Sequence, residues 1–170
     1  MNKLLAVAVL GLVSLTAGAQ DAVKSVVIPE LVQFAKPDIV EKSIVSDCAL
    51  PSRMNESLTT ALKAAGIESK AAENPQPGAG ANVLQLEIAD AVASGNAFVG
   101  HRKMVTVAGT LFQNGRQVGK FVATRNSGGG MGAGFKSSCA VLGRCTVTLG
   151  QDIAKWLASP VDGARLGDAR

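Results

Sequence analysis

The sequence is poor in aromatic residues: it has no tyrosine, one tryptophan and five phenylalanines in 170 residues. Proteins that bind single-stranded nucleic acid stack the bases on aromatic side chains and concentrate lysine and arginine on one face. Here the formal net charge is only +4, and the basic residues are spread along the chain. Nucleic acid is therefore not expected as a partner. The shortage of aromatic rings also argues against a carbohydrate-binding groove.

The sequence also lacks an apolar run that is long enough to cross a membrane. Its first apolar run, residues 4–15, follows Lys3 and precedes the small residues 17–19. A short positive start, a short apolar run and a small-x-small site are typical of a secretory signal peptide. We predict that residues 1–19 are removed and that the mature chain begins at Gln20 in the periplasm. No cysteine stands at the cleavage point, so no lipid anchor is expected.

Only three cysteines are present, Cys48, Cys139 and Cys145. An oxidising compartment predicts one disulfide and one free thiol, and the spacing alone leaves all three pairings open. If the last helix begins near Cys139, then Cys139 and Cys145 lie about 9 Å apart along its axis, too far for one bridge. If it begins at Thr148, these two can close a small loop. We favour a bridge from Cys48 to Cys139, with Cys145 as the alternative partner.

Residue types that usually carry catalysis are scarce. His101 is the only histidine, so it cannot build a typical zinc site, and we expect a solvated residue at a strand end. There is no Gly-x-Ser-x-Gly motif for serine hydrolysis. A cysteine nucleophile would need a reduced thiol in an oxidising compartment. We therefore predict no enzymatic activity, no metal site and no cofactor.

The first half of the mature chain is expected to hold one strand and one helix. Residues 23–28 and 39–45 are both rich in β-branched side chains, and either can be the first strand. Residues 50–65 place apolar side chains three or four apart and stop at Gly66, which predicts a helix. Residues 74–80 hold two prolines and two glycines and are expected to form a loop.

The second half reads as a three-stranded meander over residues 82–93, 103–113 and 116–126. Asn114-Gly115 between the last two is typical of a type I′ hairpin turn, which needs positive φ at both central residues. The register counted outward from this turn gives one face as the core, to which the first strand of the meander adds Leu84, Leu86 and Ile88. The predicted core face of the hairpin carries Val105, Val107, Leu111, Val118 and Val122.

The other face of this hairpin is less polar than a solvated sheet face usually is. Residues 23–36 can fold across part of it, or the remainder contacts a protein partner, a second copy or a lipid. The predicted residues of this face are Met104, Thr106, Ala108, Thr110 and Phe112 on one strand and Arg125, Ala123, Phe121, Gly119 and Gln117 on the next. Among them, Met104, Phe112, Phe121 and Arg125 are the candidate contact residues, together with Lys136 from the loop that follows.

A final amphipathic helix is predicted to end at about Ala158, with Pro160 beyond it. The element order is then strand, helix, three strands, helix. The simplest way to bury both helical stripes is an α+β fold with an antiparallel sheet of about four strands and two helices packed on one face. Residues 20–160 are expected to form a single domain and residues 161–170 a flexible tail.

The glycine-rich stretch 128–134 follows a strand and precedes a helix, as a phosphate-binding loop does. The spacing fails, because Phe135 separates Gly134 from Lys136. A dinucleotide-binding fold would need a further strand, which the chain does not offer. We expect a flexible linker, with the alternative that the loop amides and Lys136 hold an anion at the start of the helix and that the loop orders on binding.

The signal peptide, Cys48 ahead of the helix over 50–65, and the ending Asp152-Ile153-Ala154-Lys155-Trp156-Leu157 resemble small exported proteins of Gram-negative bacteria. The element order is similar to that of LptE-like envelope accessory lipoproteins, which place two helices against one face of a sheet. This resemblance implies an accessory role in the envelope. It rests on topology and transfers no site residue.

These observations favour a non-enzymatic, soluble periplasmic protein that acts as a binding or accessory component of the cell envelope. Its hairpin face and glycine-rich loop are the expected contact surfaces, for an envelope protein or for a second copy of the chain. The alternative is a carrier that holds a lipid or another small apolar ligand between sheet and helices. A weaker alternative is an enzyme whose residues come together only in the fold.

Overall fold

The computed structural model describes residues 22–96, 100–128 and 137–170. The predicted signal peptide and Lys136 lie outside these residues, as does the glycine-rich stretch after Gly128. The elements are, in chain order, β1 (Ser25–Pro29), a 3-10 turn η1 (Pro37–Ile39), α1 (Lys42–Asp47), α2 (Leu50–Ala64), β2 (Glu68–Ala72), β3 (Asn82–Asn96), β4 (Gly100–Gln113), β5 (Arg116–Gly128), α3 (Ser138–Leu157) and β6 (Ala164–Gly167).

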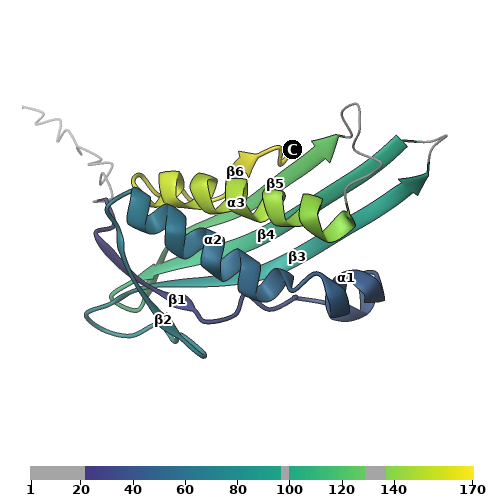
Figure 1. Cartoon of the computed structure of the whole chain (residues 1–170). Helices are drawn as coiled ribbons and strands as arrows, with labels where there is room; N and C mark the ends of the chain where they lie inside the picture. The colour runs from purple at the N-terminus through teal and green to yellow at the C-terminus, as the bar shows by residue number, and fades with distance from the viewer. Residues whose placement is uncertain (1–21, 97–99, 129–136) are drawn as a thin grey trace, which may run out of the picture.

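The described strands form one mixed sheet in the order β2-β1-β3-β4-β5-β6, with α2 and α3 over one of its faces (Figure 1). The α+β class and the antiparallel meander β3-β4-β5 agree with the sequence-based prediction. The expected four-stranded antiparallel sheet is wrong in its outer parts. There β1 pairs in parallel with both β2 and β3, and β6 pairs in parallel with β5.

The two strands that the sequence did not predict, β2 and β6, have little hydrophobic pattern. Every residue of β2 is exposed or half-buried, and β6 has only four residues. Backbone pairing with a neighbour places them, and alternation does not reveal it. Residues 161–170, expected to be a flexible tail, therefore contain an element of the sheet. Of the two candidates for the first strand, residues 23–28 are correct, whereas residues 39–45 lie across η1 and α1.

The two long helices lie where the sequence predicts them. α2 ends at Ala64, and Gly66 follows it with φ +72°, a conformation that suits glycine. α3 begins at Ser138, and the Ser137 hydroxyl accepts a hydrogen bond from the Ala140 amide at 3.3 Å. Because the helix begins before Cys139, Cys139 and Cys145 lie on the same helix and a bridge between these two is excluded. Cys48 and Cys139 form the disulfide, which confirms the favoured pairing and ties the end of α1 to the start of α3.

The hairpin register departs from the prediction at one residue. Asn114 and Gly115 both have positive φ, as a type I′ turn requires, and Gln113 lies opposite Arg116. Gln117 lies opposite Phe112, but Gly119 is the next residue paired, opposite Leu111, so Val118 is an extra residue in β5. Such a bulge moves every later side chain of the strand to the other face. Val122 is consequently 44% exposed instead of buried.

Phe121 takes the core position that the bulge creates, 2% exposed beneath the helices. Its ring meets that of Trp156 edge to face, with centroids 4.7 Å apart. It lies across Gly109 on β4, where an added Cβ would overlap the Phe121 ring and come within 2.8 Å of Leu86 Cδ2. Gly109 is thus required by a close approach. The core face of β5 is Gly119, Phe121 and Ala123 in place of Val122, while Val118 at the bulge is half-buried and packs against the core.

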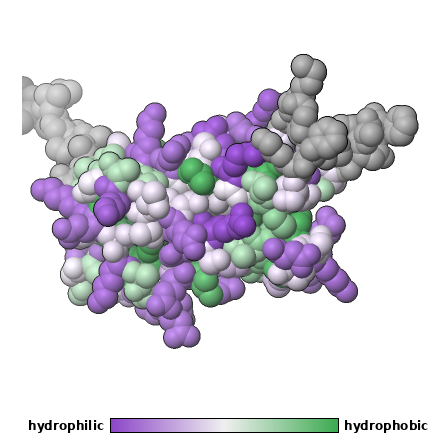
Figure 2. All heavy atoms as spheres, viewed as in Figure 1, coloured by the Kyte–Doolittle hydropathy of each residue, from purple (hydrophilic) through white to green (hydrophobic). Residues whose placement is uncertain are grey.

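The helices pack closely on each other as well as on the sheet. A Cβ at Gly150 would stand 2.7 Å from the Ser57 carbonyl oxygen, so α3 approaches the backbone of α2 there. The Ser57 and Thr146 hydroxyls are hydrogen-bonded at 3.1 Å across the same contact. The outer side of the helix pair carries hydrophilic residues with small apolar patches between them (Figure 2). The fully buried side chains fill the layer between helices and sheet.

Cys145, the free cysteine, is buried on α3 at 5% exposure. Burial raises the pKa of its thiol. In the unfolded chain a cysteine ionises near pH 8.5. The folded state therefore holds the proton to higher pH, and stability falls as pH rises above the unfolded value. Between pH 7.5 and pH 9.5 the parent is expected to lose up to about 1 kcal/mol of unfolding free energy that Cys145→Ala does not lose. Urea denaturation of both proteins at the two pH values measures this difference. Equal losses in the two proteins would contradict this reading.

Candidate functional site

The face of the sheet opposite the helices is the candidate site, and its residues follow from the alternation of the three long strands. Gln85 and Glu87 on β3, Ala108 and Thr110 on β4, and Lys120 and Val122 on β5 point away from the helices, because their strand neighbours are paired on the core face. We call this surface the open face. It combines charged, polar and apolar side chains in the middle of a sheet.

Each border of the open face is made by a segment that the sequence analysis did not place there. The Gln85 side-chain amide donates a hydrogen bond to the Pro75 carbonyl at 3.3 Å, so the loop over residues 74–80 lies beside the open face. Residues 23–36 do not fold across the open face. They supply β1 at the edge of β3, and the Ile88 amide donates to the Gln33 carbonyl at 2.8 Å.

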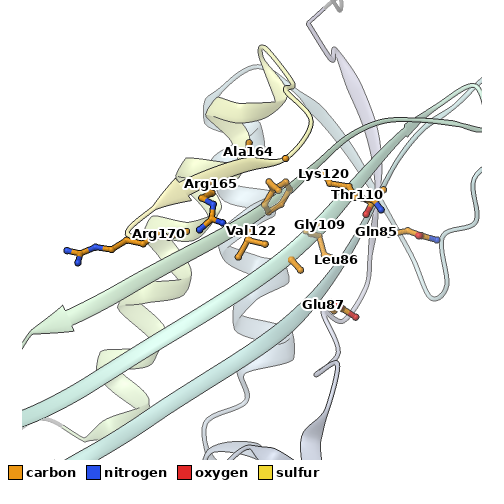
Figure 3. Close-up of a pocket in the computed structure, with 14 residues that line it drawn as sticks. Gln85, Leu86, Glu87, Gly109, Thr110, Lys120, Val122, Ala164, Arg165 and Arg170 are labelled. Carbon is orange, nitrogen blue, oxygen red and sulfur yellow. The ribbon is translucent and has the colours of Figure 1, made fainter.

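A hollow of about 570 Å³ lies on the open face between β3 and the last strand (Figure 3). Val122 and Ala108 give it apolar surface, and Arg165 lies beside Val122 from β6. Lys120 and Thr110 lie farther along the neighbouring strands, and Arg170 extends outward from the others (Figure 3). The hollow is within the size range of small-molecule sites.

Positive charge dominates the side chains that line this hollow. Lys120, Arg165 and Arg170 contribute cations, and Glu87 contributes the carboxylate. Within the described parts of the chain, the ion pairs are both made by Arg125, so none of the three cations is neutralised by an acidic side chain. A lining with apolar surface and unneutralised cations is complementary to a ligand that carries both an anion and an apolar part.

A second hollow of about 930 Å³ continues along the same face toward the far end of the hairpin. It shares Ala169 and Arg170 with the first hollow and is lined by more polar residues, among them Arg102 and Asn126. The Thr106 and Thr124 hydroxyls are hydrogen-bonded at 3.0 Å between β4 and β5 in this region. The two hollows form one furrow with β6 and the residues after it as its wall.

This wall is fixed by an arginine beneath it. Arg125 donates two hydrogen bonds of 2.7 Å to the Asp152 carboxylate on α3, and its guanidinium lies 3.5 Å from Asp168. The Asp152 hydrogen bond raises the pKa of Arg125 above its already high ordinary value, so the guanidinium keeps its charge. Asp168 also accepts a hydrogen bond of 2.8 Å from the Asn126 amide. The segment after α3 is therefore held against β5.

The structure separates the five predicted contact residues. Met104 and Phe112 belong to the open face, where both are half-buried. Phe121 and Arg125 do not: the bulge at Val118 turns them toward the helices, where they pack on Trp156 and bind Asp152. Lys136 lies outside the described residues.

The three cations of the hollow could not be found from the sequence pattern. A hairpin register without the bulge puts Lys120 on the core side, and Arg165 and Arg170 fall in the predicted tail. The one available signal was Gly119, since a glycine inside a strand often marks a bulge or a close approach. Nothing in the sequence indicates that Arg165 lies beside Val122.

Residues 22–96, 100–128 and 137–170 lack two other kinds of feature. No three histidine, cysteine, aspartate or glutamate side chains there are grouped so that they could hold a metal ion. In this part of the chain no helix has the length and apolar character needed to cross a membrane. His101 lies in β4 opposite Gly95.

The similarity of this chain to known proteins lies in the fold. No protein-family model and no curated protein matches this sequence. The chain is similar to a minor lipoprotein from Acinetobacter baumannii, with 14% identity, TM-score 0.50, and 82% of this chain and 93% of that chain covered. It is also similar to a DUF330 family protein from Xanthomonas campestris, with 8% identity, TM-score 0.54, and coverage of 84% and 87%. At these identities the likeness shows a shared fold.

Proposed function

We propose that this chain is a non-enzymatic binding protein of the bacterial cell envelope and that its binding surface is the open face of the sheet. The observation that carries the proposal is the furrow on that face, with its apolar surface and its unneutralised cations. Helices cover the other face of the sheet, and the described core side chains fill the layer between helices and sheet, so the open face is the surface that the described residues leave for a ligand.

Two features of the chain favour export, which this proposal requires. The start of the sequence has the pattern of a signal peptide, and the Cys48–Cys139 disulfide suits an oxidising compartment. One of the proteins with a similar fold is a lipoprotein of a Gram-negative bacterium. The similarity of the element order to LptE-like accessory proteins stays a prediction, as does the absence of enzymatic activity.

Site-specific photo-crosslinking in intact cells tests the surface. A photoreactive residue in place of Val122, 44% exposed on the open face, is expected to capture a partner molecule. The matched control is the same residue in place of Val147, 50% exposed on the outer side of α3, which is expected to capture none. Equal capture at both positions, or at neither, would contradict the proposal.

Native mass spectrometry of the mature protein, purified gently from its own host, adds the size of the partner. Extra mass that is lost on denaturation would be a small molecule, a protein, or a second copy of the chain. The denatured, non-reduced mass is expected to be two hydrogens below that of the three-thiol chain, because one disulfide is formed.

A further inference from the structure

The hollow on the open face has the chemistry of a lipid headgroup site. We infer that it binds an anionic phospholipid, with the phosphate between Lys120 and Arg165 and the first methylenes of an acyl chain on Val122 and Ala108. This inference rests on the proposed function, because it names the ligand class of the same open face.

Two cations flank the hollow. Lys120 is exposed on β5, and Arg165 is exposed on β6 next to Val122. Both belong to the open face of adjacent strands, two positions apart along the sheet, and neither forms an ion pair with a described acidic side chain. Arginine and lysine bind phosphate oxygens through charge-assisted hydrogen bonds. Two unneutralised cations around one hollow therefore favour a phosphate over a neutral ligand.

The hollow also exposes apolar surface. Val122 is one of the few large hydrophobic side chains that are exposed in the described chain, and it lies opposite Arg165 on β6 and two residues from Lys120 on β5. Ala108 is its partner across β4. A free inorganic anion would leave this surface in water, whereas a lipid covers it with methylene groups. The juxtaposition of Val122 with Lys120 and Arg165 thus selects an amphiphile.

The size of the hollow suits a small ligand. A volume of about 570 Å³ lies within the range of small-molecule sites. The two hollows share Ala169 and Arg170 in their linings. An acyl chain that is too long for the first hollow can therefore continue along the furrow into the second. The furrow is an open surface, as suits contact with a lipid that stays partly in a membrane.

Binding of soluble short-chain lipids tests the inference on the mature protein. Dihexanoyl phosphatidylglycerol below its micellar concentration is expected to bind, and dihexanoyl phosphatidylcholine is expected to bind much more weakly, both followed by calorimetry. The double variant Lys120→Gln, Arg165→Gln is expected to bind the anionic lipid about 10- to 30-fold more weakly. Val122→Asp is expected to weaken binding as well, because it removes the apolar contact and adds a like charge.

The control is the double variant Lys63→Gln, Lys155→Gln, which removes the same charge from exposed positions on α2 and α3 and is expected to bind like the parent. Equal loss in both double variants would show a general charge effect and overturn the inference. Displacement of the lipid by inorganic phosphate at the same concentration would mean a simple anion site and would also overturn it. Thermal unfolding verifies that each variant is folded.

Failure of this inference is distinguishable from failure of the proposed function. If Val122 captures an acidic protein in cells and no lipid binds, the open face is a binding surface and the lipid assignment is wrong. If Val122 captures nothing and no lipid binds, both are wrong.

Discussion

Removal of the Cys48–Cys139 disulfide is expected to lower the free energy of unfolding by about 4–5 kcal/mol. The bridge closes a loop with a sequence separation of 91 residues, and the entropy of the unfolded chain that such a loop removes is about this large. Urea denaturation of Cys48→Ala, Cys139→Ala against the parent measures the difference. The loss is expected to be a large part of the stability of a domain of this size.

Two controls separate the bridge from the side chains that form it. Reducing agent is expected to destabilise the parent by a similar amount and to leave the double variant unchanged. Cys145→Ala at neutral pH keeps the bridge, so it is expected to lose only what a small buried cavity costs. A double variant within about 1 kcal/mol of the parent would mean that the loop is constrained without the disulfide.

Replacement of Phe121 by alanine is expected to cost about 3–5 kcal/mol, the range for a buried phenylalanine. The ring is 2% exposed and fills the space above Gly109 against Trp156. Its loss removes the edge-to-face contact and leaves a cavity beneath α3. Trp156 is the only tryptophan, so its fluorescence during urea unfolding reports on this contact directly.

Phe112 provides the matched control on the same hairpin. It is half-buried on the open face, so Phe112→Ala is expected to cost less than half as much. If the two substitutions had equal effects, Phe121 would not occupy the core, and the bulge at Val118 would be wrong. The register predicted from the turn alone would assign both rings to the same face, so this pair of variants tests the bulge itself.

The elements with strong local patterns could be predicted from the sequence. The helix over 50–65 and the Asn114-Gly115 turn depend on side-chain period and backbone preference, which are local properties. The disulfide pairing was favoured but left open by the sequence, because the start of α3 was not fixed until the structure placed it at Ser138. The strands β2 and β6 could not be predicted, because their pairing depends on neighbours that come together only in the folded chain.

The candidate site was less predictable than the fold. Met104 and Phe112 are the two expected contact residues that lie on the open face, and a single inserted residue removed Phe121 and Arg125 from it. A bulge changes the face of every residue after it, so an error at Val118 spreads to the whole outer half of β5. Arg165 reached the site through β6, which has no hydrophobic period to reveal it.

The sequence by itself determined the α+β class, the two long helices and the hairpin turn, since periodicity and turn chemistry act over a few residues. The cysteine spacing left the pairing open, and the tertiary structure decided it by bringing Cys48 to Cys139. The tertiary structure decided which face each β5 side chain takes. There the fit of the Phe121 ring on Gly109 and Trp156 outweighs the regular alternation that would bury Val122. It also brought Lys120 and Arg165 to one hollow, because only pairing between β5 and β6 joins positions 45 residues apart in the chain.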